Sequence, residues 1–202
     1  GKVKTKSVYV VDEIIKTKNN VISKLTPSLF NDENDFYKVL KDIKNDDVRD
    51  FFTLARLLAV SDESRRGKNF EQSFVKNLDL MIESIKDYSE IIRKLNLKLG
   101  NIDLKLGDSR KIELPNNSVD GIITSPPYSI ALDYVVNDAH SLEDMGYNLN
   151  EIRENFIGVR GKGRERVDLY NEDMRKAYKE MYRILKPNKY AVIIIGNATY
   201  QE

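Results

Sequence analysis

The sequence of 202 residues contains no cysteine and only one histidine. Without cysteine, the chain cannot carry a disulfide framework, a thiolate zinc site or a cysteine nucleophile. A single histidine also excludes a His-rich metal cluster, so a metal enzyme would have to rely on carboxylates. We therefore predict no metal site.

The sequence also lacks a long apolar run and an excess of charge of one sign. No stretch approaches the roughly 18 to 20 apolar residues that span a bilayer, and the start GKVKTKSVYVVDEIIK has no signal-peptide core or cleavage site. We expect a cytoplasmic protein without a membrane partner, and Gly1 without a preceding Met suggests a trimmed or processed terminus. The 33 Lys and Arg residues against 32 Asp and Glu leave a formal net charge of +1. Any contact with nucleic acid must therefore be local.

Residues 1–99 show mainly helical apolar spacing. This spacing predicts a short helix over 36–43, a second helix starting after Asn45, and a long helix over 70–96. The long helix carries one apolar seam, formed by Phe74, Leu78, Met81, Ile85, Tyr88, Ile92 and Leu95. Packing of this seam onto the rest of the molecule is favoured over an intermolecular coiled coil, because fewer than four heptads are present. The basic stretch 61–70 is expected to be a solvated loop.

The second half of the chain reads as strands separated by a helix. Alternating residues predict a strand at 102–106, and apolar runs predict strands at 119–124 and 190–195. An amphipathic helix is predicted over 172–185, ended by Pro187. The last strand is almost wholly apolar, which is typical of a parallel strand covered on both faces. The pattern indicates an α/β fold, with a partial doubly wound sheet preceded by a helical region.

In a doubly wound sheet, ligands bind beyond the carboxyl ends of the strands. The predicted strands end at Gly107-Asp108, at Ser125–Tyr128 and at Gly196-Asn197. We interpret the last of these as a plain turn. The middle one, named the SPPY segment below, is the most specific feature of the sequence.

Two consecutive prolines define the SPPY segment. Pro126 and Pro127 can continue neither a ladder nor a helix, so the chain leaves the sheet as a stiff extended segment with free carbonyl acceptors. Ser125 adds a hydroxyl that can donate or accept, and Tyr128 adds a flat face on which a nucleobase can stack. The segment therefore predicts a rigid acceptor platform at a strand end.

The stretch LKLGDSRKIELPNNSVDGIITSPPYSIALDY, followed later by EMYRILKPNKYAVIIIGN, resembles the amino-methyltransferases that use S-adenosylmethionine to methylate exocyclic nitrogens of DNA bases. The resemblance implies a Rossmann-like methyltransferase sheet over residues 100–202, with residues 1–99 packed on that fold or inserted in it. It also implies DNA methylation, in a restriction-modification or solitary setting. The Ser form of the tetrapeptide leans toward cytosine N4, and adenine N6 stays open.

The resemblance assigns catalysis to Ser125, Pro126, Pro127 and Tyr128. An exocyclic amine is conjugated with its ring, so hydrogen bonds to the Ser125 hydroxyl and the Pro126 carbonyl would favour its lone-pair-bearing form. Tyr128 would stack on the target base, which must be flipped out of double-stranded DNA. Cofactor contacts are expected from Asp108 and Ser125. An Asp108 that only forms a turn is an equal alternative.

The sequence departs from the family at one motif. These enzymes carry a Gly-rich loop after a strand, in a phrase such as DPFxGSGT, which holds the methionine end of the cofactor. This chain has no such phrase, and its nearest string, Gly161-Lys162-Gly163, follows no apolar strand. We therefore expect that the chain is a fragment of a longer enzyme or shares its site with a second polypeptide, and that it binds the cofactor weakly alone.

A basic loop is predicted at about residues 150–168, between the two matching segments. Its glycines suggest mobility, and its cations Arg160, Lys162, Arg164 and Arg166 suggest contacts with the phosphate backbone. We favour nucleic-acid contact over plain surface charge because the loop leaves from the neighbourhood of the catalytic strand.

Two other functions remain open beside DNA methylation. One is an RNA base methyltransferase that uses the same tetrapeptide logic, although the sequence shows no separate RNA-binding module. The other is an inactive nucleic-acid-binding subunit that keeps the fold without the cofactor loop.

Overall fold

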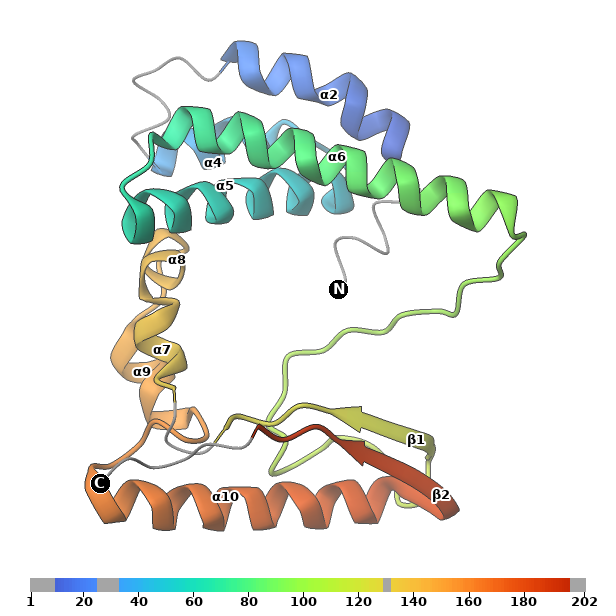
Figure 1. Ribbon diagram of the computed structural model, residues 1–202, viewed down its shortest axis with the longest axis vertical. Coiled ribbons are helices and arrows are strands. Elements are labelled where there is room, and N and C mark those ends of the chain that lie inside the picture. Colours follow the sequence, from blue (N-terminus) through green and yellow to red (C-terminus); the bar gives the residue numbers. More distant parts are fainter. Residues whose placement is uncertain (1–9, 25–32, 129–131, 197–202) are drawn as a thin grey trace. The chain divides into compact units, whose positions relative to one another are not determined.

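The computed structural model describes residues 10–24, 33–128 and 132–196. The chain divides into two compact units between Leu104 and Lys105 (Figure 1). The described part of the first unit is helical, and that of the second combines helices with a small parallel sheet. None of the helices in these ranges is both long and apolar enough to cross a membrane.

The helices of the first unit largely follow the predicted ranges. They are α2 (Val11–Lys24), α4 (Glu33–Lys41), α5 (Asp46–Arg66) and α6 (Phe70–Lys94). The Asn45 side chain caps α5 by accepting from the Asp47 amide at 3.1 Å, and Asn69 caps α6 in the same way. Helix α2 is not among the predicted helices, although its buried residues Ile14 and Val21 are spaced two helical turns apart.

Aromatic and aliphatic side chains form the core of the first unit. Phe36 meets Phe74 edge to face with ring centroids 5.5 Å apart, and the guanidinium carbon of buried Arg56 lies 4.8 Å from the Phe36 centroid. Leu78 and Ile85 of α6 are buried in the same core. The first half of the predicted seam therefore packs within the unit, as the sequence favours.

The prediction of a loop over residues 61–70 is wrong for most of its length. Helix α5 continues to Arg66, and Asp62 accepts hydrogen bonds from Arg66 at 2.7 Å and from Lys68 at 3.0 Å. Gly67 then ends the helix in the left-handed region with a φ of 61°. Arg66 and Lys68 are thus engaged at the helix end.

The second unit contains a parallel pair of strands connected through a long helix. Strand β1 (Val119–Thr124) has the predicted bounds, and it pairs with β2 (Leu185–Ile193), which directly follows α10 (Gly163–Ile184). The segment between β1 and α10 carries α7 (Tyr134–Asn137), α8 (Ala139–Asp144) and α9 (Leu149–Asn155). This is the strand–helix–strand unit of α/β folds. The larger doubly wound sheet stays a prediction.

Two strand predictions are corrected. Residues 102–106 form no strand, and Leu106 is fully exposed, because no strand among the described residues pairs with this segment. The apolar strand β2 is not covered on both faces by the described residues, since Tyr190 is 84% exposed and Val192 is 51% exposed. A two-stranded sheet with one long helix has too few elements to bury such a strand.

The predicted basic loop is also shorter and more ordered than expected. The first residues of the predicted loop belong to helix α9. Helix α10 starts nine residues before the predicted helix over 172–185, so only residues 156–162 lie between the two helices. Arg166 in the first turns of α10 donates to the Gly158 carbonyl at 2.7 Å. Gly158 has a φ of 92°, a left-handed conformation that explains the glycine without mobility.

Candidate active site

The SPPY segment leaves the carboxyl end of β1, where the sequence places it. Pro126 is buried and Ser125 is exposed. The Tyr170 hydroxyl of α10 donates to the Pro127 carbonyl at 2.8 Å, and the hydroxyl oxygens of Ser125 and Tyr128 lie 3.2 Å apart. Helix α10 therefore holds the SPPY segment in place. Within the segment, the hydroxyl groups of Ser125 and Tyr128 face each other.

The Tyr128 ring is packed by residues from distant parts of the second unit. A Cβ atom at Gly196 would lie 3.1 Å from Cδ2 of Tyr128, so glycine allows the chain to approach the ring closely. The Tyr128 amide donates to the Tyr134 hydroxyl at 3.5 Å, and the Tyr134 ring stacks on Phe156. From the sequence, Gly196 is interpreted as a plain turn, and its close approach to the Tyr128 ring is not predicted. Asn197 lies outside the described residues.

Gly107, Asp108 and Pro127 line one open cleft of about 430 Å³. Its other lining residues are Leu106, Ser109, Arg110, Asn155, Phe156 and Ile157. Two of the predicted strand ends therefore converge, although the segment before Gly107 is not a strand. The Asp108 carboxylate accepts from the Arg110 amide at 2.8 Å, which is a local turn. The turn-forming role of Asp108 is thus present, and its cofactor contact stays a prediction.

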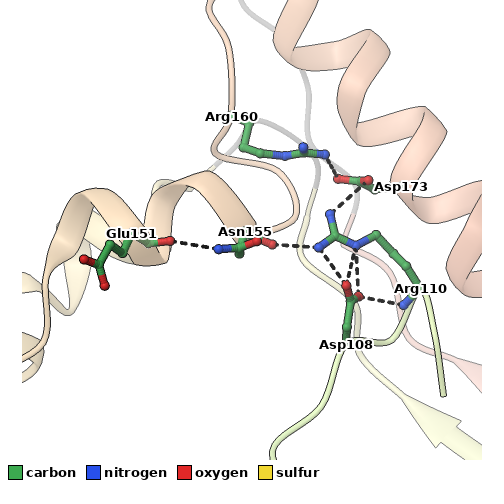
Figure 2. A network of polar contacts seen from close by, with 6 residues as sticks. All are labelled: Asp108, Arg110, Glu151, Asn155, Arg160 and Asp173. Carbon is green, nitrogen blue, oxygen red and sulfur yellow. Dashed lines mark hydrogen bonds and ion pairs between the residues drawn. The ribbon is translucent and has the colours of Figure 1, made fainter. Parts of the chain in front are cut away.

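Asp108 belongs to a network of charged side chains centred on Arg110 (Figure 2). The Arg110 guanidinium donates to both carboxylate oxygens of Asp108, at 2.8 to 3.0 Å, and to Asp173 of α10 at 3.1 Å. Its bonds to Asp108 lower the pKa of that carboxyl below its ordinary value of 3.8 and raise the pKa of Arg110. Arg160 contacts the second oxygen of Asp173. Sequence reasoning missed Arg110 and Asp173, and only the Asp-x-Arg turn signals part of their arrangement.

The four basic residues proposed for nucleic-acid contact fall into two pairs. Arg160 is bound to buried Asp173, and Arg166 donates to the Gly158 carbonyl, so both guanidinium groups are used inside the unit. Lys162 and Arg164 are exposed, and neither forms an ion pair within the part of the chain that the structure describes. Lys162 and Arg164 are therefore the cations that face solvent.

Asp133 and Arg153 connect the segment after the SPPY segment to α9. Asp133 caps α7 by accepting from the Val136 amide at 3.1 Å, and it accepts from Arg153 at 2.8 Å. Burial alone would raise the pKa of Asp133, but the bonds from Arg153 and from the amide outweigh burial and lower it. Arg153 also donates to the Val159 carbonyl. Across the described residues, no group of three or more His, Asp or Glu side chains is arranged to hold a metal ion.

Comparison with curated proteins finds 48 residues in which this chain is 44% identical to the Type II methyltransferase M.MjaVI of Methanocaldococcus jannaschii. The stretch covers 24% of this chain and 25% of that protein, so the chain spans about a quarter of the length of this curated relative. No family model matches the chain, and no solved structure matches it. The local similarity supports a methyltransferase and leaves the methylated base open.

Proposed function

We propose that this chain is a DNA methyltransferase, or the catalytic half of one, that transfers a methyl group from S-adenosylmethionine to an exocyclic base amine. Cytosine N4 is preferred over adenine N6 because the tetrapeptide begins with Ser125. The observation that carries the proposal is the convergence of the SPPY segment and the Asp108 turn, since Pro127 and Asp108 line one cleft. The local similarity to a type II methyltransferase adds support.

We place the adenosyl part of the cofactor in this cleft. Leu106, Phe156 and Ile157 offer apolar contact to a purine, and Asp108 places a half-exposed carboxylate beside them for the ribose hydroxyls. When bound, the cofactor supplies a methyl group on a positively charged sulfur. In the described ranges, no helix begins directly after an apolar strand, so we assign the methionine end to a Gly-rich loop on another polypeptide or a further segment.

Ser125 and the Pro126 carbonyl would bind the target amine as acceptors. Ser125 is exposed at the strand end, and the Pro126 carbonyl accepts no hydrogen bond from the described residues. Two acceptors on the amine hydrogens draw the nitrogen toward a tetrahedral form whose lone pair points at the incoming methyl group. The prolines hold both acceptors in place before the substrate arrives, so little reorganisation is needed.

Tyr128 would orient the base by stacking. Its amide is bound by Tyr134 and its ring lies against Gly196, so the ring is held before a base arrives. A base inside a duplex cannot reach this position, so the proposed substrate is double-stranded DNA with a flipped target base. Lys162 and Arg164 are the exposed cations proposed to contact its phosphates.

The test measures methyl transfer from cofactor labelled in the methyl group. The full chain is incubated with double-stranded DNA or with transfer RNA, alone and together with the polypeptide that carries the Gly-rich loop, and modified nucleosides are identified by mass spectrometry. We expect N4-methylcytosine in DNA. N6-methyladenine in DNA would correct the base, modified RNA would favour the RNA enzyme, and binding of DNA without any transfer would favour the inactive subunit.

A further inference from the structure

Arg110 connects three separate parts of the second unit with one guanidinium group. It holds Asp108 in its own turn, donates to the Asn155 carbonyl at the end of α9 at 3.1 Å, and donates to Asp173 in α10 (Figure 2). The Arg110 side chain is only 16% exposed. A planar fork of donors can satisfy several acceptors in fixed directions, which a lysine ammonium cannot do.

Asp173 is the fixed point of this arrangement. Its side chain is 3% exposed, and it lies inside a helix of 22 residues. A buried carboxylate needs paired charges, and here Arg110 and Arg160 take one oxygen each. Because α10 also binds the SPPY segment through Tyr170, the same helix holds both the Asp108 turn and the proposed catalytic platform.

A second arginine fastens the other end of the same segment to α10. Arg183 donates to the Ile112 carbonyl at 2.8 Å and to the Leu114 carbonyl at 2.7 Å, while Glu180 accepts from the Ile112 amide at 2.9 Å. None of these groups lines the cleft. The segment after the Asp108 turn is therefore attached to the helix without Arg110, so the Arg110 bonds act on the rim of the cleft.

Building on the proposed function, we propose that Arg110, anchored by Asp173, is a positioning residue that sets the Asp108 turn at the distance from Pro127 at which the cleft accepts an adenosyl group. Arg110 does not take part in the chemical step. It decides how well the nucleoside is bound, because a rim that is free to move must be ordered again on each binding event.

The test compares Arg110→Lys and Arg110→Gln with the matched control Arg183→Lys. All variants are made in the full chain, in the presence of the polypeptide that completes the cofactor site. Affinity for S-adenosylhomocysteine is measured by calorimetry. Thermal unfolding is recorded, and amide hydrogen exchange is followed at Arg110 and Lys111, whose N–H groups donate to the Asp108 carboxylate and carbonyl in the wild type.

We expect both Arg110 variants to weaken affinity by about tenfold and to speed exchange at the turn, with Arg110→Lys no better than Arg110→Gln, since the fork geometry matters more than the charge. Arg183→Lys should lower the unfolding temperature as much as the Arg110 variants do. It should nevertheless leave the affinity for S-adenosylhomocysteine within about twofold of the wild type. A second variant, Asp173→Asn, should reproduce the exchange change without altering the cleft lining.

The outcomes separate the two proposals. Equal loss of affinity in Arg110→Lys and Arg183→Lys would make Arg110 a general stabiliser and overturn the positioning role. If the wild type binds no S-adenosylhomocysteine even when complemented, the proposed function fails. The hydrogen-exchange data then still test whether Arg110 positions the Asp108 turn. Unchanged exchange at the turn in Arg110→Gln would then overturn the positioning role by itself.

Discussion

Ser125 and Tyr128 face each other across the SPPY segment, with their hydroxyl oxygens 3.2 Å apart. In the proposed reaction the two side chains act on the same base, one on its amine and one on its ring. Neither side chain carries a net charge, so neither adds to the electrostatic attraction that dominates affinity for DNA. Their loss is therefore expected to appear in the chemical step.

We predict that Ser125→Ala and Tyr128→Ala abolish methyl transfer in the complemented enzyme and leave DNA affinity within about tenfold. The matched control is Ser118→Ala, because Ser118 also follows a turn in this unit, but its hydroxyl only donates to the Pro115 carbonyl. Transfer of labelled methyl groups and a fluorescence binding titration give the two readouts. Wild-type transfer in either variant would remove the residue concerned from the catalytic assignment.

Gly196 carries a second prediction at this scale. Adding a methyl group there places a carbon 3.1 Å from the Tyr128 ring, which must then shift by a few tenths of an ångström. We expect Gly196→Ala to reduce methyl transfer several-fold and to cost about 1 kcal/mol in the free energy of unfolding. Gly121→Ala is the control, because the added carbon would lie 3.7 Å from its nearest neighbour, an ordinary contact. Equal transfer rates in the two variants would contradict the role of the Tyr128 position.

Among the secondary-structure elements, helix α10 makes the contacts that hold the loops of the second unit in place. Tyr170, Asp173, Glu180 and Arg183 lie along it and bind the SPPY segment, the Arg110 side chain and the segment after the Asp108 turn. A helix is rigid over this length, so groups attached to it keep fixed distances from one another. The elements of the candidate site are thus positioned by one common support.

The ion pair of Glu180 with Arg183 predicts how the stability of this unit depends on pH. The bond from Arg183, with that from the Ile112 amide, lowers the pKa of Glu180 from 4.5 to about 2. A lowered folded pKa means that the contribution is complete above pH 4.5 and is lost as the pH falls from 4.5 to about 2. Glu180→Gln should therefore flatten the fall of unfolding free energy in this window, as measured by urea titration at several pH values.

The control for this pH effect is Glu172→Gln. Glu172 lies on the same helix in an exposed pair with Lys176, and such pairs contribute little to stability. We expect this variant to keep the wild-type pH profile. A profile that Glu180→Gln leaves unchanged would show that the ion pair of Glu180 with Arg183 contributes nothing measurable to stability.

The two pairs of basic residues should separate in their effects. Replacing exposed Lys162 and Arg164 with Gln is expected to weaken DNA binding and to reduce the salt slope by up to about two counterions. Arg160→Gln removes one partner of buried Asp173, so it should cost about 2 kcal/mol in the free energy of unfolding. Binding titrations at several salt concentrations and urea unfolding distinguish the two effects. An unchanged salt slope in the double variant would leave these cations without a role in DNA contact.

At the scale of the whole molecule, the second unit exposes apolar side chains that an α/β fold normally buries. Tyr182, Tyr190 and Ile195 are exposed, and β2 has a free edge among the described residues. Exposed apolar surface of this kind is typical of a contact region. The first half of the α6 seam packs within the first unit, so the region around β2 is the better candidate for contact with the proposed partner polypeptide.

We predict that the chain alone binds S-adenosylmethionine only weakly and transfers no methyl groups. Activity should appear when a polypeptide that carries the Gly-rich loop is added, since backbone N–H groups at a helix N-terminus hold the methionine end. The measurement is calorimetric titration of the cofactor into the chain with and without that polypeptide. Micromolar binding with turnover by the chain alone would show that its cofactor site is already complete.

The features that depend on neighbouring residues can be predicted from the sequence alone. Apolar spacing predicts α5 and α6, with a start signal at Asn45 for α5, and an apolar run predicts β1, because a helix or strand face is set by residues a few positions apart. The SPPY segment was placed at a strand end because prolines cannot continue the strand. The apolar spacing does not predict helix α2 or the early start of α10, because many charged residues lie between their apolar positions.

Which groups meet across the chain is known only from the folded structure. Arg110 binds Asp173 across 63 positions, and Tyr170 binds Pro127 across 43. The same structure turned Arg160 from an expected surface cation into the partner of a buried carboxylate, and it left residues 102–106 without a strand. The physical reason is common to all of these. A charge or a strand acquires its role from a partner, and the partner is brought close only when the chain folds.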